Sequence, residues 1–349
     1  MSALWTDVAT RARGLATHFL SRATLEALSG SPDLAALADG LRGLGRVPIG
    51  AVTPQDLELA LRRGHARQLE VLARWCGPRA ERLPLVFEAE DLRSLRRLVR
   101  LTSGVGAGQD AALGCPLAGI IPTPTLPERA LATLAEQPNL KSLTTLLGFW
   151  RHPFAPAVQA AASDKVDLFT LDRALESAFA SRVVAAAEGE GHVLADATAR
   201  YIDAANARIL LVLAQAPRAT RDEGAFLPGG RILTRERFDR FFAAPTPSEM
   251  ARHLADAFGH SPLAEPFRAQ AAQARSPSAG LLLTTVESDL FSALLRVQRH
   301  EALRDPLGLA PILTFALGLR VEAIDLATLV WGFALGAPRI TIASALVTP

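Results

Sequence analysis

The residues of this chain that come closest to a chemical site are acids followed three positions later by Asp or Asn, because this pair occurs three times. The pairs are Glu88 with Asp91, Asp203 with Asn206, and Glu322 with Asp325. Side chains three positions apart lie on one side of a helix, so each pair could cap a neighbouring element, bind an arginine or line a shared axis. An active site usually needs one asymmetric constellation, so the threefold occurrence argues against catalysis. We interpret the pairs as caps and hydrogen bonds within each helical lobe.

Other motifs that would carry chemistry are incomplete. No Gly-Lys pair occurs in the sequence, which excludes a P-loop. The segment from Gly104 to Gly108 looks like a phosphate loop, but it follows an expected helix rather than a strand, and we interpret it as linker. His300-Glu301 is followed by Arg304 where a zinc peptidase would need a second histidine. We predict no catalytic, cofactor-binding or metal-binding residues, although an all-α enzyme with an unrecognised site stays an alternative.

Four arginines form the most distinctive charged pattern. They follow one another at i, i+3, i+4 and i+7 on an expected helix, as Arg93, Arg96, Arg97 and Arg100. This spacing places them on one face at the C-terminal end of the helix, where cations interact favourably with the helix dipole. The face is either solvated or a docking surface for an acidic partner. We name these four residues as the possible partner interface.

The acid–Asx pairs belong to an eight-residue pattern that recurs at a step of roughly 115 residues. Each copy has an acid, Ala, any residue, Asp or Asn, three further residues and Leu. The copies begin at residues 88, 203 and 322. An apolar residue followed by an acid precedes each copy, at Leu57, Leu171 and Val286. A fixed long period is typical of a duplicated structural unit.

These features predict three pseudo-symmetric helical repeats. We place the first over residues 1–105, the second over 128–217 and the third over 232–349. Stretches rich in Gly and Pro, which end periodic segments, form linkers over 106–127 and 218–231.

Composition favours an all-α fold. Ala, Leu and Arg dominate, Tyr201 is the single tyrosine, and runs of β-branched residues are scarce, so strands have little to build on. A net charge of only +2 over 349 residues is low for a nucleic-acid binder, whose cations are usually more numerous and clustered. We expect no nucleic-acid partner.

Cysteine content and hydropathy limit where the chain could work. Cys76 and Cys115 lack the spacing of a metal site and fit a reducing cytoplasm. The mean hydropathy of +0.20 is high, but the longest apolar stretches, 307–319 and 326–338, are shorter than the roughly 20 residues that cross a bilayer. We expect no membrane span.

Local signals predict several helix starts. Thr53-Pro54-Gln55-Asp56 and Thr246-Pro247-Ser248-Glu249 both have the form of a capping box with proline in the first turn. The apolar spacing from Leu4 to Leu28 predicts a single helix there. A further helix is expected to start around Ser31-Pro32-Asp33, where Ser can cap and Pro suits the first turn.

The ordered motifs together resemble a known family. Three opening segments, Arg11–Leu15, Leu20–Arg22 and Thr24–Leu28, resemble the start of the C subunits of archaeal-type and bacterial V-type rotary ATPases, which are relatives of the d subunit of eukaryotic V-ATPase. The segment 87–93 is similar to the aromatic-acid-x-x-Asn-aliphatic-basic signature of that family, and 201–208 and 322–332 resemble its later copies. The resemblance spans nearly the whole chain, with Asp at positions 91 and 325 where the signature has Asn.

The resemblance implies both a shape and a function. It implies a funnel of three helical lobes that sits on the cytoplasmic face of the membrane rotor ring and receives the tip of the central stalk. The implied function is that of a non-catalytic adaptor, peripheral to the membrane, which couples the central-stalk subunits to the rotor ring during ATP-driven ion transport or ATP synthesis. The alternative hypothesis is an α-helical interaction scaffold outside any rotary ATPase.

Overall fold

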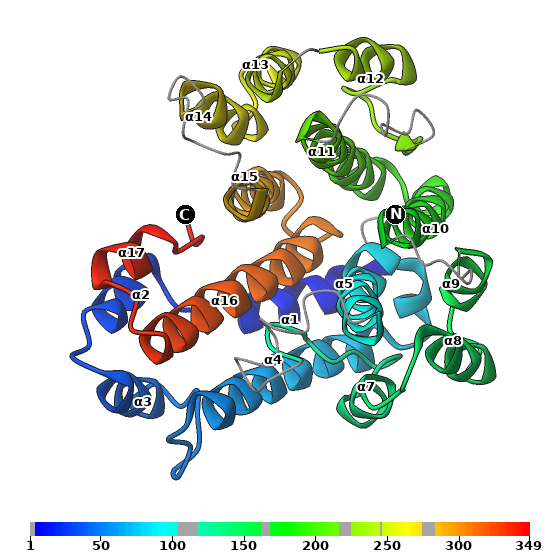
Figure 1. The fold of residues 1–349 in the computed structure, drawn as a ribbon. Coiled ribbons are helices and arrows are strands. Elements are labelled where there is room, and N and C mark those ends of the chain that lie inside the picture. Colours follow the sequence, from blue (N-terminus) through cyan, green and yellow to red (C-terminus); the bar gives the residue numbers. More distant parts are fainter. Residues whose placement is uncertain (1–3, 104–116, 162–167, 216–224, 245, 274–282) are drawn as a thin grey trace. The chain divides into compact units, whose positions relative to one another are not determined.

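The chain is all-helical, which confirms the predicted fold class. A computed structural model describes residues 4–103, 117–161, 168–215, 225–244, 246–273 and 283–349, and every regular element in these ranges is a helix. The Gly104–Gly108 stretch, Cys115 and large parts of both predicted linkers lie outside the described residues. Figure 1 shows the order of the helices from the N-terminus in blue to the C-terminus in red.

The chain divides into two compact units, each assembled from separate segments. Unit 1 comprises Met1–Thr10, Val183–Leu317 and Pro349, and unit 2 comprises Arg11–Arg182 and Gly318–Thr348. The division falls within three helices: α1 (Thr6–Ala16), α10 (Leu168–Glu190) and α16 (Ala310–Ala334). The three predicted repeats were defined by recurring sequence patterns, whereas these two units are defined by how compactly their residues pack. The repeats therefore stay a prediction.

The remaining helices lie within one unit each. Unit 2 holds α2 (Arg22–Ser29), α3 (Leu34–Gly43), α4 (Pro54–Cys76), the 3-10 helix η2 (Gly77–Arg82), α5 (Pro84–Thr102), α7 (Glu128–Ala135), α8 (Leu140–Phe149), α9 (Ala155–Ala161) and α17 (Arg339–Ser344). Unit 1 holds α11 (His192–Gln215), α12 (Arg235–Phe242), α13 (Pro247–Phe258), the 3-10 helix η5 (Pro262–Ala264), α14 (Glu265–Gln273) and α15 (Leu283–Arg304).

Helix starts follow the predicted local signals in two cases. Thr53 caps α4 in a full capping box with Asp56, and the Thr246 side chain accepts the backbone N–H of Glu249 at the start of α13. The predicted helix over residues 4–28 is wrong, because it is broken between α1 and α2, where Ser21 caps the second helix. An N-cap hydroxyl competes with helix continuation by binding a backbone N–H itself.

The start of α3 also differs from the prediction. Asp33 is its N-cap, and its carboxylate accepts the backbone N–H of Ala36 at 2.8 Å. Pro32 therefore lies just before the helix rather than in its first turn. Asp is at least as good a cap as Ser, so the helix begins after the acid.

A pair of short helices recurs at three places along the chain. The pairs are α2 with α3, α7 with α8, and α12 with α13, and the first helix of each pair buries two apolar residues that lie three positions apart. Those residues are Leu25 and Leu28, Leu131 and Leu134, and Phe238 and Phe241. The second helix of each pair is capped by a polar side chain, from Asp33, Asn139 and Thr246 in turn.

Helices near the two ends of the chain share the core of unit 2. Leu25 on α2 and Leu37 on α3 are fully buried with Leu329 of α16 and with Ile342 of α17, which is 2% exposed. Figure 1 shows α17, in red, beside α2 and α16. Burial of apolar side chains from segments some 300 residues apart makes the terminal helices part of one hydrophobic core.

Arg151 has the only left-handed backbone among the described residues other than glycine, with φ of 54°. It follows α8 in a Schellman turn, in which the N–H of His152 donates to the carbonyl of Leu147 at 3.0 Å. Gly45, with φ of 69°, occupies the same place after α3, where the N–H of Arg46 donates to Leu41. A side chain with a Cβ is strained in this conformation and glycine is not.

We expect Arg151→Gly to raise the free energy of unfolding by about 0.5–1 kcal/mol, because it relieves this strain at an exposed position. The matched change Gly45→Ala should lower it by a similar amount, since an added Cβ there meets no atom within 4 Å and only backbone strain changes. Urea unfolding of both variants measures the two shifts. Equal signs for the two would contradict the strain explanation.

Candidate functional site

The repeated acid–Asx pairs are buried on α5, α11 and α16. Asp91, Asn206 and Asp325 are 0% exposed, and the three acids that precede them are 9% exposed or less. A buried polar group that lacks a hydrogen bond loses its contacts with water without replacement, so such groups are normally paired. Their partners decide whether the pairs could act as a chemical site.

Asn206 on α11 binds a loop through both atoms of its amide. Its Oδ1 accepts the backbone N–H of Leu227 at 2.9 Å, and its Nδ2 donates to the carbonyl of the same residue at 2.8 Å. The amide offers one donor and one acceptor side by side, whereas an ionised carboxylate offers acceptors alone, which explains Asn rather than Asp at this copy.

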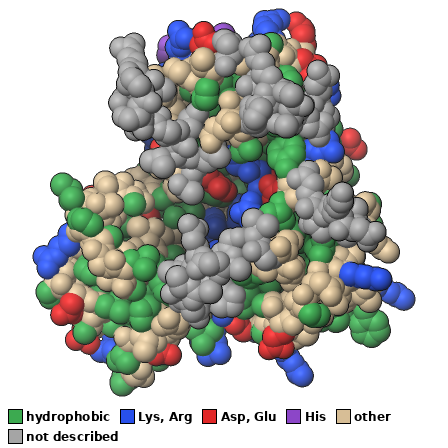
Figure 2. Space-filling model, viewed as in Figure 1, with side chains coloured by type: hydrophobic (Ala, Val, Ile, Leu, Met, Phe, Trp, Pro, Cys, Tyr) green, Lys and Arg blue, Asp and Glu red, His purple; other side chains and the backbone are tan. Residues whose placement is uncertain are grey.

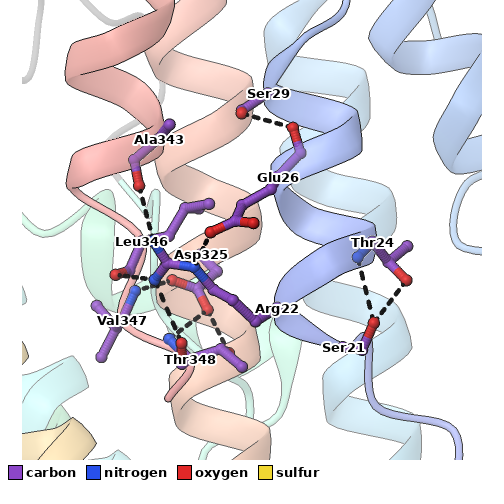
Figure 3. Close-up of polar contacts among 10 residues, drawn as sticks. All are labelled: Ser21, Arg22, Thr24, Glu26, Ser29, Asp325, Ala343, Leu346, Val347 and Thr348. Carbon is purple, nitrogen blue, oxygen red and sulfur yellow. Dashed lines mark hydrogen bonds and ion pairs between the residues drawn. The ribbon is translucent and has the colours of Figure 1, made fainter.

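Asp325 on α16 faces donors only. Its carboxylate accepts the backbone N–H groups of Val347 at 2.5 Å and Thr348 at 3.0 Å, and also the Thr348 hydroxyl at 2.5 Å (Figure 3). Asp91 on α5 likewise accepts two hydroxyls, from Thr123 and Thr125. A carboxylate accepts at both oxygens, so these two environments suit Asp where the family signature has Asn.

The C-terminal tail is held from a second side by Arg22 of α2. Its guanidinium donates to the carbonyls of Leu346 at 2.9 Å and Ala343 at 3.2 Å, while its Nε donates to Glu26 at 2.7 Å (Figure 3). Asp325 and Arg22 together satisfy donors and carbonyls of the last residues of unit 2. The tail is therefore an integral part of that unit.

Asp325 gives a pH-dependent prediction. Burial raises the pKa of its carboxyl, against the opposing effect of the hydrogen bonds from Thr348 and Val347. A raised folded-state pKa stabilises most below the unfolded value of about 3.9, and that contribution is lost as pH rises through the folded pKa. The parent chain should therefore become more stable relative to the Asp325→Asn variant, in free energy of unfolding, as pH falls from 7 to 4. Urea unfolding across this range measures it, and a shift in the opposite direction would show that hydrogen bonding outweighs burial.

Glu322 on α16 lies in a buried ionic cluster of unit 2. Its carboxylate is 2.8 Å from Nη2 of Arg46 and 3.4 Å from Nε2 of His65, and it accepts the backbone N–H of Leu20 at 2.8 Å. The side chains of Glu322 and His65 are 3% and 5% exposed, so these partners must replace the water that would otherwise stabilise the Glu322 carboxylate.

The other two leading acids are satisfied in different ways. Glu88 on α5 forms a two-bond pair with Arg182 of α10, with both N–O distances at 2.5 Å. Glu88 also raises the pKa of the Arg182 guanidinium, chiefly through this hydrogen bond. Asp203 on α11 accepts backbone N–H groups from Arg231, Ile232 and Leu233, at 2.8–3.1 Å. These contacts confirm that the pairs form hydrogen bonds inside the fold. The expectation that each pair stays within its own lobe is wrong for two of the acids, because Glu88 binds Arg182 and Glu322 binds Arg46, which belong to other predicted repeats.

Gly230 lets the backbone approach Asp203. A Cβ built on this glycine would lie against the Asp203 carboxylate, closer than real Cβ contacts come. We expect Gly230→Ala to lower the free energy of unfolding by about 1–3 kcal/mol, because the loop must move away from its acceptor. Gly189→Ala is the matched control, since nothing lies within 4 Å of a Cβ there. Thermal unfolding of both variants checks the prediction, and an equal effect of the two would contradict it.

The predicted arginine face of α5 is largely engaged inside unit 2. Arg96 pairs with Asp172 and, at 3.0 Å, with Glu176 of α10, and Arg93 pairs with Glu90 at 2.6 Å. Arg97 is half-buried. The Arg100 side chain is 55% exposed and lies 3.9 Å from Asp172. Much of this charge is thus neutralised by carboxylates, and the docking role of the four arginines stays a prediction.

A groove that sequence reasoning missed lies between α4 and the loop that precedes it. It has a volume of about 680 Å³ and is lined by Gly45–Ala51 on one side and by α4 residues from Asp56 to Arg67 on the other. The signals that the sequence offered were an apolar Ile49 between Pro48 and Gly50, in an expected turn, and two arginines four positions apart at 63 and 67. Only the fold shows that the loop turns back along α4.

Neither a metal centre nor a membrane span is found in the part of the chain that the structure describes. No group of three or more His, Cys, Asp or Glu side chains there could hold a metal ion. None of the helices is long and apolar enough to cross a bilayer, among the residues described. Figure 2 shows basic and acidic side chains interspersed with hydrophobic ones over one face of the molecule.

Comparisons with known proteins point in one direction. A sequence model of the family described as ATP synthase (C/AC39) subunit matches residues 8–345. The chain is also similar to the C subunit of the V-type ATP synthase from two strains of Thermus thermophilus. Each is 26% identical over 298 residues, which cover 84% of this chain and 83% of the relative.

Proposed function

The chain belongs to the family of ATP synthase (C/AC39) subunits, and from this premise we propose that it is the non-catalytic subunit of a V-type rotary ATPase that couples the central stalk to the membrane rotor ring. The observation that carries the proposal is the family match over residues 8–345, nearly the entire chain. The adaptor would work during ATP-driven ion transport or ATP synthesis.

The internal contacts support a mechanical part. An adaptor that transmits torque must resist deformation, and buried ionic and hydrogen-bonded groups fix one arrangement of helices. Glu322, Asp325 and Glu88 each join segments distant in the sequence. Their polar atoms are engaged within the fold rather than presented to a substrate. This use of the repeated acids supports the non-catalytic part of the proposal.

A funnel of three helical repeats belongs to the same proposal. Its support is the order of elements, in which a capped pair of short helices precedes two longer helices at three places along the chain. The second long helix, α5, α11 or α16, then carries the repeated pattern. Three copies of this helix order, arranged around one axis, would suit a socket for a single stalk.

We place the adaptor on the cytoplasmic side of the membrane, held there through the rotor ring. The proposed partners are the central-stalk subunits and the ring. The arginine face of α5 is one candidate contact, and Arg100, at 55% exposure, is its most accessible member. Arg100→Glu should then weaken assembly with the complex, whereas Arg252→Glu, at another exposed arginine, should not.

Coupling is tested in membrane vesicles from the native host. Vesicles from a strain that lacks this chain should hydrolyse ATP without building an ion gradient, and addition of the purified chain should restore the gradient. The ATP-hydrolysing head and the ring must be present in equal amounts in both preparations. Full ion pumping without the chain would overturn the proposal and leave a helical scaffold outside the rotary complex.

A further inference from the structure

The groove between α4 and the preceding loop has the dimensions of a binding site. Its volume of about 680 Å³ falls within the range of about 300–1,000 Å³ that ligand pockets occupy. All of its lining residues belong to unit 2. In Figure 1 this loop is the blue segment that joins α3 to α4.

Large apolar side chains project from this loop. Ile49 is 91% exposed and Val52 is 64% exposed, and Leu44 at the start of the loop is 44% exposed. A single exposed apolar residue needs no explanation, but three within nine positions, beside a groove, form a patch of the kind that binds partners.

The loop is anchored, so the exposure of Ile49 does not result from slack chain. Val47 and Ala51, on either side of Ile49, are buried in the core of unit 2. The N–H of Ala51 donates to the carbonyl of Pro48 at 3.4 Å, and Gly50 takes the φ of 96° that the turn requires. A fixed turn thus presents Ile49 to solvent.

The opposite wall of the groove is cationic. Arg63 and Arg67 lie one turn apart on α4, both are exposed, and neither pairs with a carboxylate of the described residues. Of the other charges at the groove, Arg46 is paired with Glu322 at 2.8 Å. Asp56 is exposed and accepts the Thr53 hydroxyl at 2.6 Å in the capping box of α4, so it adds one negative charge against the two positive charges of Arg63 and Arg67.

The net charge of the groove is therefore positive, with the two arginines of α4 outnumbering the single carboxylate, and it lies beside an apolar patch. Guanidinium groups four positions apart match carboxylates at the same spacing on a facing helix, which they can bind bidentately. A concave site suits an inserted segment better than a flat bilayer. We infer that this groove binds an acidic amphipathic helix of another protein, with Ile49 as the apolar anchor and Arg63 and Arg67 as carboxylate partners.

A direct test uses the purified full chain and a fluorescein-labelled helical peptide with leucines on one face and glutamates four positions apart on the other. Fluorescence anisotropy should show binding that weakens at high salt, because exposed ion pairs are screened. The double variant Arg63→Glu/Arg67→Glu should bind at least about tenfold more weakly. Ile49→Ser should also weaken binding. Arg74→Glu, on the same helix outside the groove, should bind as the parent chain does.

Two outcomes would overturn the inference. One is equal affinity of the parent chain and the double variant for the peptide, or equal affinity of the parent for a matched peptide with lysines in place of glutamates. The other is that vesicles of phosphatidylserine bind through Arg63 and Arg67 while the acidic peptide does not bind, which would make the surface a membrane contact. Circular dichroism of each variant checks that the helices are retained.

The natural partner is then located in the purified native complex with a photocrosslinker in place of Ile49. Crosslinks should map to an acidic segment of another subunit and should disappear in the double variant, whereas crosslinks only to a basic or neutral segment would contradict the inference. Peptide binding is read on the isolated chain and coupling is read in vesicles. A result that refutes peptide binding in the groove can thus be told apart from a result that refutes the proposed coupling function.

Discussion

Replacing Arg46 by Ala is expected to lower the free energy of unfolding by about 3–5 kcal/mol, the cost of leaving a buried charge without its partner. Glu322 is 3% exposed at the side chain, and Arg46 supplies its closest cation at 2.8 Å. His65 at 3.4 Å and the backbone N–H of Leu20 remain, and they offset only part of the loss. Urea unfolding followed by circular dichroism measures the shift in midpoint.

Two controls separate burial of the charge from loss of the arginine side chain. Arg46→Ala combined with Glu322→Gln removes the stranded charge and should recover a large part of the loss. Arg240→Ala breaks an ion pair with Glu236 whose side chains are 67% and 81% exposed, and it should cost less than about 1 kcal/mol. If the exposed and buried pairs gave equal losses, the buried cluster would not have the role described.

The change Asn206→Asp should be nearly as damaging, with an expected loss of about 2–4 kcal/mol at neutral pH. The introduced carboxylate would still accept the N–H of Leu227 but would turn its second oxygen toward the carbonyl of that residue, which now receives the Nδ2 donor at 2.8 Å. The position is 0% exposed, so neither the new charge nor the carbonyl reaches water.

Acidification should reverse part of this loss, because a protonated carboxyl can donate to the Leu227 carbonyl as the amide does. Burial raises the pKa of such a carboxyl, so recovery should begin above the usual value of about 3.9 for Asp. Asn206→Ala, which has nothing to protonate, is the matched control and should show no comparable recovery. Unfolding of both variants between pH 7 and pH 4 gives the comparison, and parallel pH profiles would contradict the mechanism.

In all three copies the Asp or Asn of the repeated pattern forms hydrogen bonds with a segment that follows it in the sequence. The donors and acceptors that this segment presents determine whether an amide or a carboxylate fits. Asn206 faces a donor and an acceptor, whereas Asp325 faces donors alone. If the chain has the coupling function proposed above, variants in which these hydrogen bonds are lost should assemble but transmit torque less well. Ion pumping in the vesicles used to test coupling would measure that loss.

Local signals in the sequence were enough to predict the fold class and several of the helices. Alanine and leucine content and apolar spacing predicted an all-helical chain, and the capping boxes at Thr53 and Thr246 marked two helix starts, because these features act between residues within one or two turns. The same local rules gave wrong details where two local signals competed, as in the break before Ser21 and the start of α3 after Asp33.

The partners of the polar residues, in contrast, could not be predicted without the packing of the helices. Arg96 was predicted to lie on a basic face, and it does lie on α5, but its carboxylate partners are on α10. Glu322 meets Arg46 across 276 positions, and Ile49 and Arg67 line one groove because a loop folds back on α4. Such pairings depend on which apolar helix faces pack together. The spacing of residues along a single helix shows which face is apolar but not which other helix that face will meet.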